Sequence, residues 1–574
     1  MLSHRNRACT IAILFALLFF SGNLCAAGPQ TICYSVAPNP YLDAHAADIK
    51  KIYDGFFFVV GSWESLTQRF VGDAVTPPQD QAWLQAARRN IASLRAAGVT
   101  ENLMGVYFSS DGAWPSPNKL LGEDYAQKME REFSTLGHVA KDLGFRGVSI
   151  DVEYPYPRYE VTNPLYRYNN YTVEDLLSAA HREGTRSMAA LLDKFPEAVV
   201  MVLPGSPRGR PIDQAFMLGM LQTMVQRNAP GGFHFGSEYT YCLADRVTDL
   251  AGSRFADAMM GSLTDADTVA YWKRYCSVAP GVWPLHMVET GGEDYPLQAW
   301  PKEVAELHAQ MAGLRAVARR YIWAFSGNPS WYVYSPELEK AYGLKKQQLV
   351  RGDIDLHLWH QLLEDKPALE PASRLSPLVE AIRKFDGGEI DAEALCDAFG
   401  TPGRWWVLGM LGSPHKQPQF LPSRALQRPI LTQDVFDGRD GAVRWFAYDD
   451  LDPRGVVDLR HVFNFQSTDD SAAYLSTYVE APRATRAYLN VGWDDGVTVQ
   501  LGGQTVFQVD PPSGHGVLYR DKYRFEKRVP ITLPAGRTRL NVVSVNYWGS
   551  WEFTLRITDE NGVPIPGVRF RLQS

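Results

Sequence analysis

Two carboxylates, Asp151 and Glu153, stand two residues apart in the segment GFRGVSIDVEYPYPRYE, residues 144–160. The apolar run at 147–150 predicts a short buried strand, and residues two apart on an extended chain point to the same side. Pro155 then stops the strand. Neighbouring negative charge raises the pKa of a carboxyl group toward neutrality, which suits a group that must donate a proton. The pair therefore indicates acid chemistry at a strand end.

The elements around this pair alternate between short apolar runs and longer amphipathic stretches. Helices are predicted at Gln81–Ala97, Asp124–Leu143, from the cap Thr172 to Phe195, and at Lys302–Arg319. Eight such strand and helix units predict an α/β fold, a (β/α)₈ barrel of the TIM type. The expected strands are Thr31–Val36, Gly55–Val60, Leu103–Phe108, Gly147–Ile150, Ala198–Leu203, Gly232–Phe235, Val282–Val288 and Tyr321–Ala324.

In a barrel of this kind the chemistry lies at the carboxyl ends of the strands. Carboxylates and aromatic rings follow several of the predicted strands, which suits cleavage of a glycosidic bond by one acid and a second carboxylate. We expect Glu153 to be the acid, and Asp151 to tune the pKa of that acid or to orient the substrate. Glu289 or Glu238 is expected to be the nucleophile or base. The residues expected to bind substrate are Asp111, Tyr154, Tyr239, Trp323 and Trp331.

The segment Phe145–Pro155 resembles the fourth-strand motif of the family-eighteen chitinases. In that family the last of four spaced acidic positions is the Glu that acts as the acid. The resemblance implies that Glu153 is the acid and that Asp151 orients the N-acetyl group of a substrate. The first two acidic positions carry Arg146 and Ser149 here, so the resemblance covers only the end of the motif.

The chain also resembles the large clan of retaining barrel glycosidases, in which the acid follows strand four and the nucleophile follows strand seven. This resemblance implies Glu153 and Glu289 in those two roles. That clan has Asn before the acid, where this sequence has Val152. Glu238 is the other candidate for the second carboxylate. Trp323 is similar in place to the floor tryptophan of the chitinases.

From Trp405 onward the sequence pattern changes and predicts short strands separated by Gly, Pro and Asp. Residues 497–501 alternate strictly, and Gly502-Gly503 predicts a tight hairpin. Residues 401–574 are therefore predicted to form a β-sandwich of the jelly-roll type. The sequences GWDDGV (492–497) and FTLRITD (553–559) resemble the accessory sandwiches of secreted bacterial glycosidases. We interpret the Asp-Asp-Gly of the first as a hairpin turn rather than a calcium loop.

Four regions are predicted: a signal peptide at 1–27, a catalytic barrel at 28–340, a helical extension or linker at 341–400 beside the barrel, and the sandwich at 401–574. The first has two arginines, an apolar run and Cys-Ala-Ala, typical of secretory signals. We therefore expect a secreted or periplasmic protein. No other apolar run is long enough to span a bilayer.

The net charge of −7, with no basic cluster, argues against nucleic acid as the partner. A carbohydrate substrate is expected, with no cofactor, because no His and acidic cluster has metal-ligand spacing. Cys242 and Cys276 could form a disulfide or be buried thiols, and the sequence does not indicate an oligomeric state. The alternatives to a glycoside hydrolase are an inactive carbohydrate-binding barrel and a cell-surface structural protein.

Overall fold

The computed structural model describes residues 28–72, 75–107, 117–152, 172–203, 211–237, 265–282, 285–288, 298–301, 304–325, 332, 340–342, 364, 376–386, 388–412, 424–449, 451–463, 468–493, 495–509, 527–547 and 551–572. Residues 1–27, the predicted signal peptide, lie outside this part of the chain. Among the described helices, none combines the length and apolarity needed to cross a membrane.

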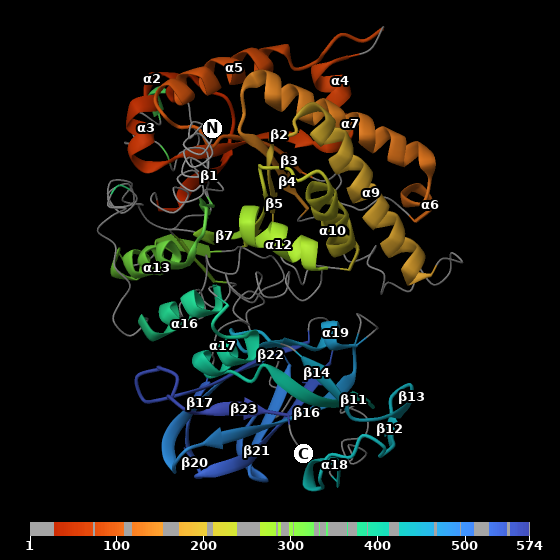
Figure 1. The fold of residues 1–574 in the computed structure, drawn as a ribbon, viewed down its shortest axis with the longest axis vertical. Coiled ribbons are helices and arrows are strands. Elements are labelled where there is room, and N and C mark those ends of the chain that lie inside the picture. Colours follow the sequence, from red (N-terminus) through yellow and green to blue (C-terminus); the bar gives the residue numbers. More distant parts are fainter. Residues whose placement is uncertain are drawn as a thin grey trace, which may run out of the picture.

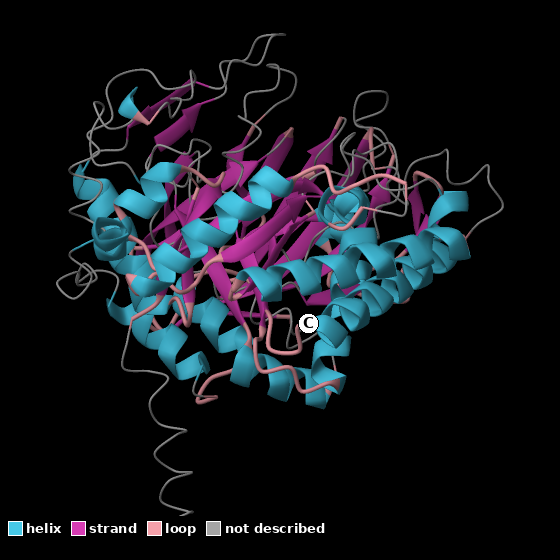
Figure 2. Ribbon diagram, turned by 90° about the horizontal axis from the view of Figure 1, so that it is seen from above, coloured by secondary structure: helices cyan, strands magenta, loops and turns pink. Residues whose placement is uncertain are grey.

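Eight parallel strands close into a barrel in the order β1-β10-β7-β6-β5-β4-β3-β2. Helices lie on its outer side, as Figures 1 and 2 show, so the predicted (β/α)₈ fold is confirmed. The strands are β1 (Gln30–Val36), β2 (Gly55–Ser62), β3 (Leu103–Tyr107), β4 (Gly147–Asp151), β5 (Val199–Leu203), β6 (Phe233–Ser237), β7 (Ser277–Val282) and β10 (Tyr321–Ala324). The longer helices are α5 (Gln81–Ala96), α7 (Glu123–Leu143), α9 (Val173–Lys194), α10 (Pro211–Gln226), α12 (Ala266–Tyr275) and α13 (Val304–Val317).

The strands are apolar along almost their whole length because both of their faces are covered. All five residues of β5 are buried, as are the first four of β4. One face fills the barrel and the other lies under the helices, so a continuous apolar run replaces the alternation of a half-exposed strand. The closure pairs β1 with β10, with Gln30 opposite Tyr321.

The seventh strand is not where the sequence predicted it. The barrel strand is β7, which ends at Val282, the residue where the predicted strand began. The second half of the prediction is β8 (Leu285–Val288), which pairs antiparallel with β9 (Gln298–Pro301) in a separate two-stranded sheet. The error has a physical cause: β7 contains Pro280 and Gly281, which are depleted in strands and indicate a turn when read locally.

Helices α9 and α10 approach closely because each has a glycine at the contact. A Cβ on Gly184 would lie 2.0 Å from the carbonyl oxygen of Phe216. A Cβ on Gly219 would lie 2.1 Å from the carbonyl oxygen of His181. The predicted cap of α9 is confirmed, since the Thr172 hydroxyl accepts a hydrogen bond from the Asp175 amide and the Asp175 carboxylate accepts one from the Thr172 amide.

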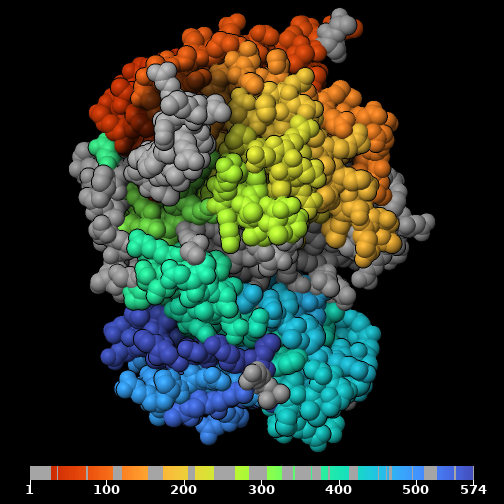
Figure 3. Space-filling model, in the orientation of Figure 1, coloured from red at the N-terminus to blue at the C-terminus, as the bar shows by residue number. Residues whose placement is uncertain are grey.

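Two helices, α16 (Ser376–Asp386) and α17 (Ala392–Phe399), link the barrel to the second domain. Their buried apolar residues form one small core with Val317 of α13, which includes Leu378, Ile382, Leu395 and Phe399. The sequence predicted that this region lies beside the barrel. In the structure it lies between the barrel and the sandwich (Figures 1 and 3).

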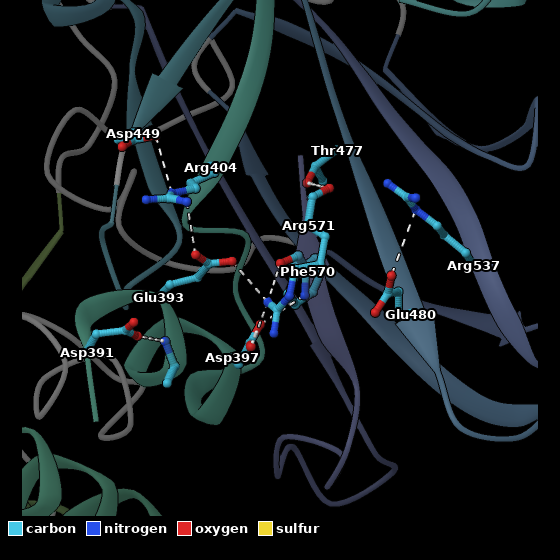
Figure 4. Close-up of polar contacts among 11 residues, drawn as sticks. Asp391, Glu393, Asp397, Arg404, Asp449, Thr477, Glu480, Arg537, Phe570 and Arg571 are labelled. Atoms are coloured by element: carbon cyan, nitrogen blue, oxygen red, sulfur yellow. Dashed lines mark hydrogen bonds and ion pairs between the residues drawn. The ribbon is translucent and has the colours of Figure 1, made fainter. Parts of the chain in front are cut away.

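Helix α17 is also tied to the sandwich by ion pairs. The Arg571 guanidinium lies 3.1 Å from Glu393 and 2.9 Å from Asp397, and Arg404 lies 3.1 Å from the other oxygen of Glu393 and 3.3 Å from Asp449 (Figure 4). Three strands of the sandwich and one helix therefore share a single charge network.

The sandwich consists of two antiparallel sheets whose inner faces share one apolar core. The Gly502-Gly503 turn of β18 and β19 is confirmed, with φ of 59° and 82° and Leu501 opposite Gln504. The larger sheet has β14 (Phe446–Asp449), β11 (Arg404–Leu411), β16 (Ser471–Ala481), β21 (Gly536–Asn546), β18 (Gly496–Leu501) and β19 (Gln504–Gln508), with β23 (Arg569–Arg571) beside β16. The smaller has β15 (Val456–Asp458), β22 (Glu552–Thr558), β17 (Thr485–Trp493) and β20 (Lys527–Leu533).

Candidate active site at the carboxyl end of the barrel

Asp151 is the last residue of β4, at the carboxyl end of the barrel where such folds hold their chemistry. Its neighbours in register are Tyr107 of β3 and Leu203 of β5. The Tyr34 hydroxyl, from β1, donates a hydrogen bond of 2.8 Å to Oδ2 of Asp151. Because β1 and β4 are separated by β2 and β3 in the barrel, this bond reaches across its interior. The Asp151 carboxylate is therefore oriented by a side chain from the opposite wall.

Aromatic rings surround Tyr34 and form a floor beneath this bond. The centroids of Phe57 and Trp323 each lie 5.6 Å from that of Tyr34, in edge-on contacts, and that of Phe325 lies 5.7 Å away. Edge-on and tilted contacts of this length are favourable for aromatic pairs. Trp323 is only 1% exposed. As it lies, the ring supports Tyr34 from below, and its substrate-binding role stays a prediction.

Ser237 is a second polar group at the same end of the barrel. It ends β6 and is 1% exposed. Within the described part of the chain its hydroxyl has no hydrogen-bond partner. A buried hydroxyl without a partner is costly, and such groups in native structures call for an explanation.

Most of the predicted site residues lie outside the described part of the chain. The structure brings together Asp151 and Trp323, joined through Tyr34. The residues that the structure does not describe are Glu153, Glu238, Glu289, Asp111, Tyr154, Tyr239 and Trp331. Their roles, like that of Asp151, stay predictions.

Tyr34 was missed in the sequence because a tyrosine inside an apolar run looks like an ordinary core residue. Its partner Asp151 is 117 residues away. The two residues come together only because of where β1 and β4 lie around the barrel. No local sequence pattern predicts this contact.

The opposite end of the barrel holds a second buried polar group that the site does not use. His234 is fully buried, and its Nδ1 lies 2.9 Å from the Ser277 hydroxyl. Burial and then the positive charge of Arg320 hold the pKa of His234 well below its usual range. The ring is therefore neutral near pH 7.

Asp495 of the sandwich has a structural role. Its Oδ2 accepts a hydrogen bond of 2.6 Å from the Tyr547 amide. The predicted hairpin at this stretch is wrong, because the strands on either side, β17 and β18, belong to different sheets and do not pair with each other. Asp494 lies outside the described residues. Across the described ranges, no three His, Cys, Asp or Glu side chains gather as metal ligands would. The Cys276 sulfur accepts a hydrogen bond from the Phe233 amide, while Cys242 is not described.

No protein-family model matches the sequence, and a search of curated proteins finds no match. Among solved structures, a family 39 glycoside hydrolase from the gut symbiont Bacteroides cellulosilyticus WH2 is 10% identical over 89% of this chain and 81% of its own, with a TM-score of 0.31. Morphinone reductase is 12% identical over 57% and 91% of the two chains, also with a TM-score of 0.31.

The PA14 sugar-binding domain from an RTX adhesin is 19% identical over 17% of this chain, with a TM-score of 0.14, and the match spans about half of that domain, 51%. The hydrolase and the reductase have the same low TM-score. Barrel folds host many unrelated activities, so likenesses this distant do not choose the chemistry.

Proposed function

We propose that the protein is a glycoside hydrolase that acts on a poly- or oligosaccharide at the carboxyl end of its barrel. The observation that carries the proposal is the Asp151 carboxylate, which ends β4 and is held by Tyr34 above an aromatic floor. An oriented carboxylate at the carboxyl end of the barrel suits a sugar, whose hydroxyls need hydrogen-bond acceptors.

In this proposal Glu153 protonates the oxygen of the leaving sugar as the glycosidic bond breaks. The charge of Asp151, two residues before it, favours the protonated form of Glu153 until that step. Tyr34 acts as a positioning residue, because its hydrogen bond fixes the direction of the Asp151 carboxylate.

The second carboxylate attacks the sugar carbon or activates a water molecule. Glu238 directly follows the barrel strand β6, whereas Glu289 follows β8, which belongs to a separate sheet. Glu289 still follows the seventh barrel strand β7 in the chain, although β8 stands between them, so its expected role stays a prediction. We favour Glu238, and Glu289 stays as the alternative.

The test is a screen of the purified protein against polysaccharides and aryl glycosides, with Glu153→Gln beside the wild type. Glu174→Gln, an exposed carboxylate on α9, is the matched control. We expect turnover by the wild type and the control, and a loss of about 10²-fold or more in Glu153→Gln. Sugar binding without turnover in every variant would replace the proposal with an inactive, carbohydrate-binding barrel.

The proposal includes export, with cleavage after the predicted segment 1–27. Expression of the full chain in a bacterium, followed by N-terminal sequencing of the mature protein, tests this. Recovery of the uncleaved chain in the cytoplasm would contradict it.

A further inference from the structure

A pocket on the sandwich lies outside the candidate active site. It is formed by the short helix α18 (Arg424–Gln427), the turn after it, the first residue of strand β12 (Phe436–Gly438), and Trp445, which directly precedes β14. Its volume is about 270 Å³. Figure 1 places α18 at the end of the sandwich away from the barrel, and β12 with the adjoining β13 (Gly441–Val443) along one side of the sandwich. The residues that line the pocket include Arg424, Arg428, Pro429, Asp434, Phe436 and Trp445.

Two arginines give this pocket its positive charge. Arg424 and Arg428 are exposed, and neither forms an ion pair with a described residue. They are four residues apart around a helical turn, where like charges repel each other. The protein as a whole has a net charge of −7. Two guanidinium groups with no ion-pair partner among the described residues, in one pocket of an acidic protein, therefore point to an anionic ligand.

The other walls indicate that the anion is part of a larger, hydroxyl-bearing molecule. Asp434 lines the same pocket; its carboxylate repels a bare phosphate or sulfate but accepts hydrogen bonds from hydroxyl groups. Pro429, Phe436 and Trp445 supply apolar surface. Pockets for drug-sized ligands have roughly 300–1,000 Å³, so this smaller volume suits one sugar ring.

Buried packing and hydrogen bonds hold the pocket residues against the larger sheet. Trp445 and Ala425 are buried in a satellite core with Leu408 and Tyr474 of the larger sheet. Behind the turn, the Arg539 guanidinium of β21 donates hydrogen bonds to the Arg428 carbonyl oxygen and to the Ser476 hydroxyl. The backbone that carries one of the two cations is thus fixed to the sheet, which reduces the ordering cost of binding.

We infer that this pocket binds an acidic sugar unit, with Arg424 and Arg428 on its carboxylate and Asp434 on its hydroxyls. The inference does not depend on hydrolysis at the barrel, since it concerns a separate surface. It assigns a uronate-containing saccharide as the ligand class of the sandwich.

The test is calorimetric titration of the full protein carrying Glu153→Gln, so that no substrate is consumed. The probes are trimers of galacturonate, mannuronate and glucuronate, with the neutral maltotriose for comparison. We expect at least one uronate trimer to bind, maltotriose not to bind, and affinity to fall as salt is raised.

The double variant Arg424→Ala/Arg428→Ala should weaken uronate binding at least tenfold. The matched control Arg483→Ala/Arg486→Ala removes two exposed arginines elsewhere on the sandwich and should leave binding unchanged. An unchanged urea midpoint verifies that both variants fold. No uronate binding, equal binding of maltotriose, or full binding by the Arg424→Ala/Arg428→Ala variant would each overturn the inference. Hydrolysis lost in Glu153→Gln but kept in the arginine variant separates this outcome from that of the proposed function.

Discussion

Glu183 is a buried acid on α9 whose ionisation should cost the barrel stability. It is 3% exposed, and its carboxylate accepts a long hydrogen bond of 3.3 Å from the Ser187 hydroxyl. Burial raises the pKa of Glu183 to about 7, although Ser187 and then Arg186 oppose the rise. Arg186 itself is paired with Glu123 and Glu130. We predict that Glu183→Gln stabilises the protein at neutral and alkaline pH.

The direction of this stability change with pH follows from proton linkage. Between pH 4.5 and 7 the folded state holds a proton on Glu183 that the unfolded state has released, so the free energy of unfolding falls as the pH rises through this window. At about 1.36 kcal/mol for each pKa unit, the rise corresponds to a penalty of about 3 kcal/mol once the carboxyl is ionised. Little of this is present at pH 5. The difference between Glu183→Gln and the wild type should therefore grow by about 2.5 kcal/mol from pH 5 to pH 8.

The assay is urea-induced unfolding at pH 5 and pH 8, followed by hydrogen exchange of peptides from α9. This readout reports on the barrel separately from the sandwich, which matters because a chain of two domains need not unfold in one step. Glu174→Gln, exposed on the same helix, is the control and should shift stability equally at both pH values. A Glu183→Gln difference that is the same at pH 5 and pH 8 would refute the reasoning.

Three further predictions concern the helix contact, the domain link and the active site. Gly219→Ala places a methyl group 2.1 Å from a backbone oxygen and should lower the free energy of unfolding by about 3 kcal/mol, measured with urea, whereas Gly412→Ala, with open space around it, should change it by less than about 0.5 kcal/mol. Arg571→Ala should speed hydrogen exchange in α17 by removing its ion pairs, and Arg569→Ala, exposed on the same strand, should not; equal exchange in both would contradict the link. Tyr34→Phe should lower kcat/KM about tenfold on whichever glycoside is turned over, without changing the urea midpoint, and unchanged kinetics would exclude the positioning role.

The seventh barrel strand shows where sequence reasoning fails. Pro280 and Gly281 lie inside β7, and the more apolar stretch that follows belongs to a small separate sheet. A barrel strand can carry such residues because its pairing and burial are decided by both neighbouring strands. Glu289 was expected directly after this strand; it follows β7 in the chain, with β8 between them.

The helical region after the barrel shows a similar limit of prediction from sequence. The pattern of α16 and α17 predicts helices, but not that Leu395 and Phe399 join a core with Val317 of the barrel. Nor does it predict that Arg571, near the end of the chain, pairs with Glu393 and Asp397. Helical periodicity identifies an apolar face, while the partner of that face is a tertiary fact.

The sequence by itself determined the alternation of strands and helices, the cap at Thr172, the glycine hairpin of the sandwich, and the placement of Asp151 at a strand end. Each of these depends on contacts within a few residues, where propensity, capping and turn geometry act. The tertiary structure alone decided the bond between Tyr34 and Asp151, the close approach at Gly184 and Gly219, and the pocket of Arg424 and Arg428. These depend on barrel closure, helix spacing and the packing of one sheet, which are set by many residues together and by no short segment.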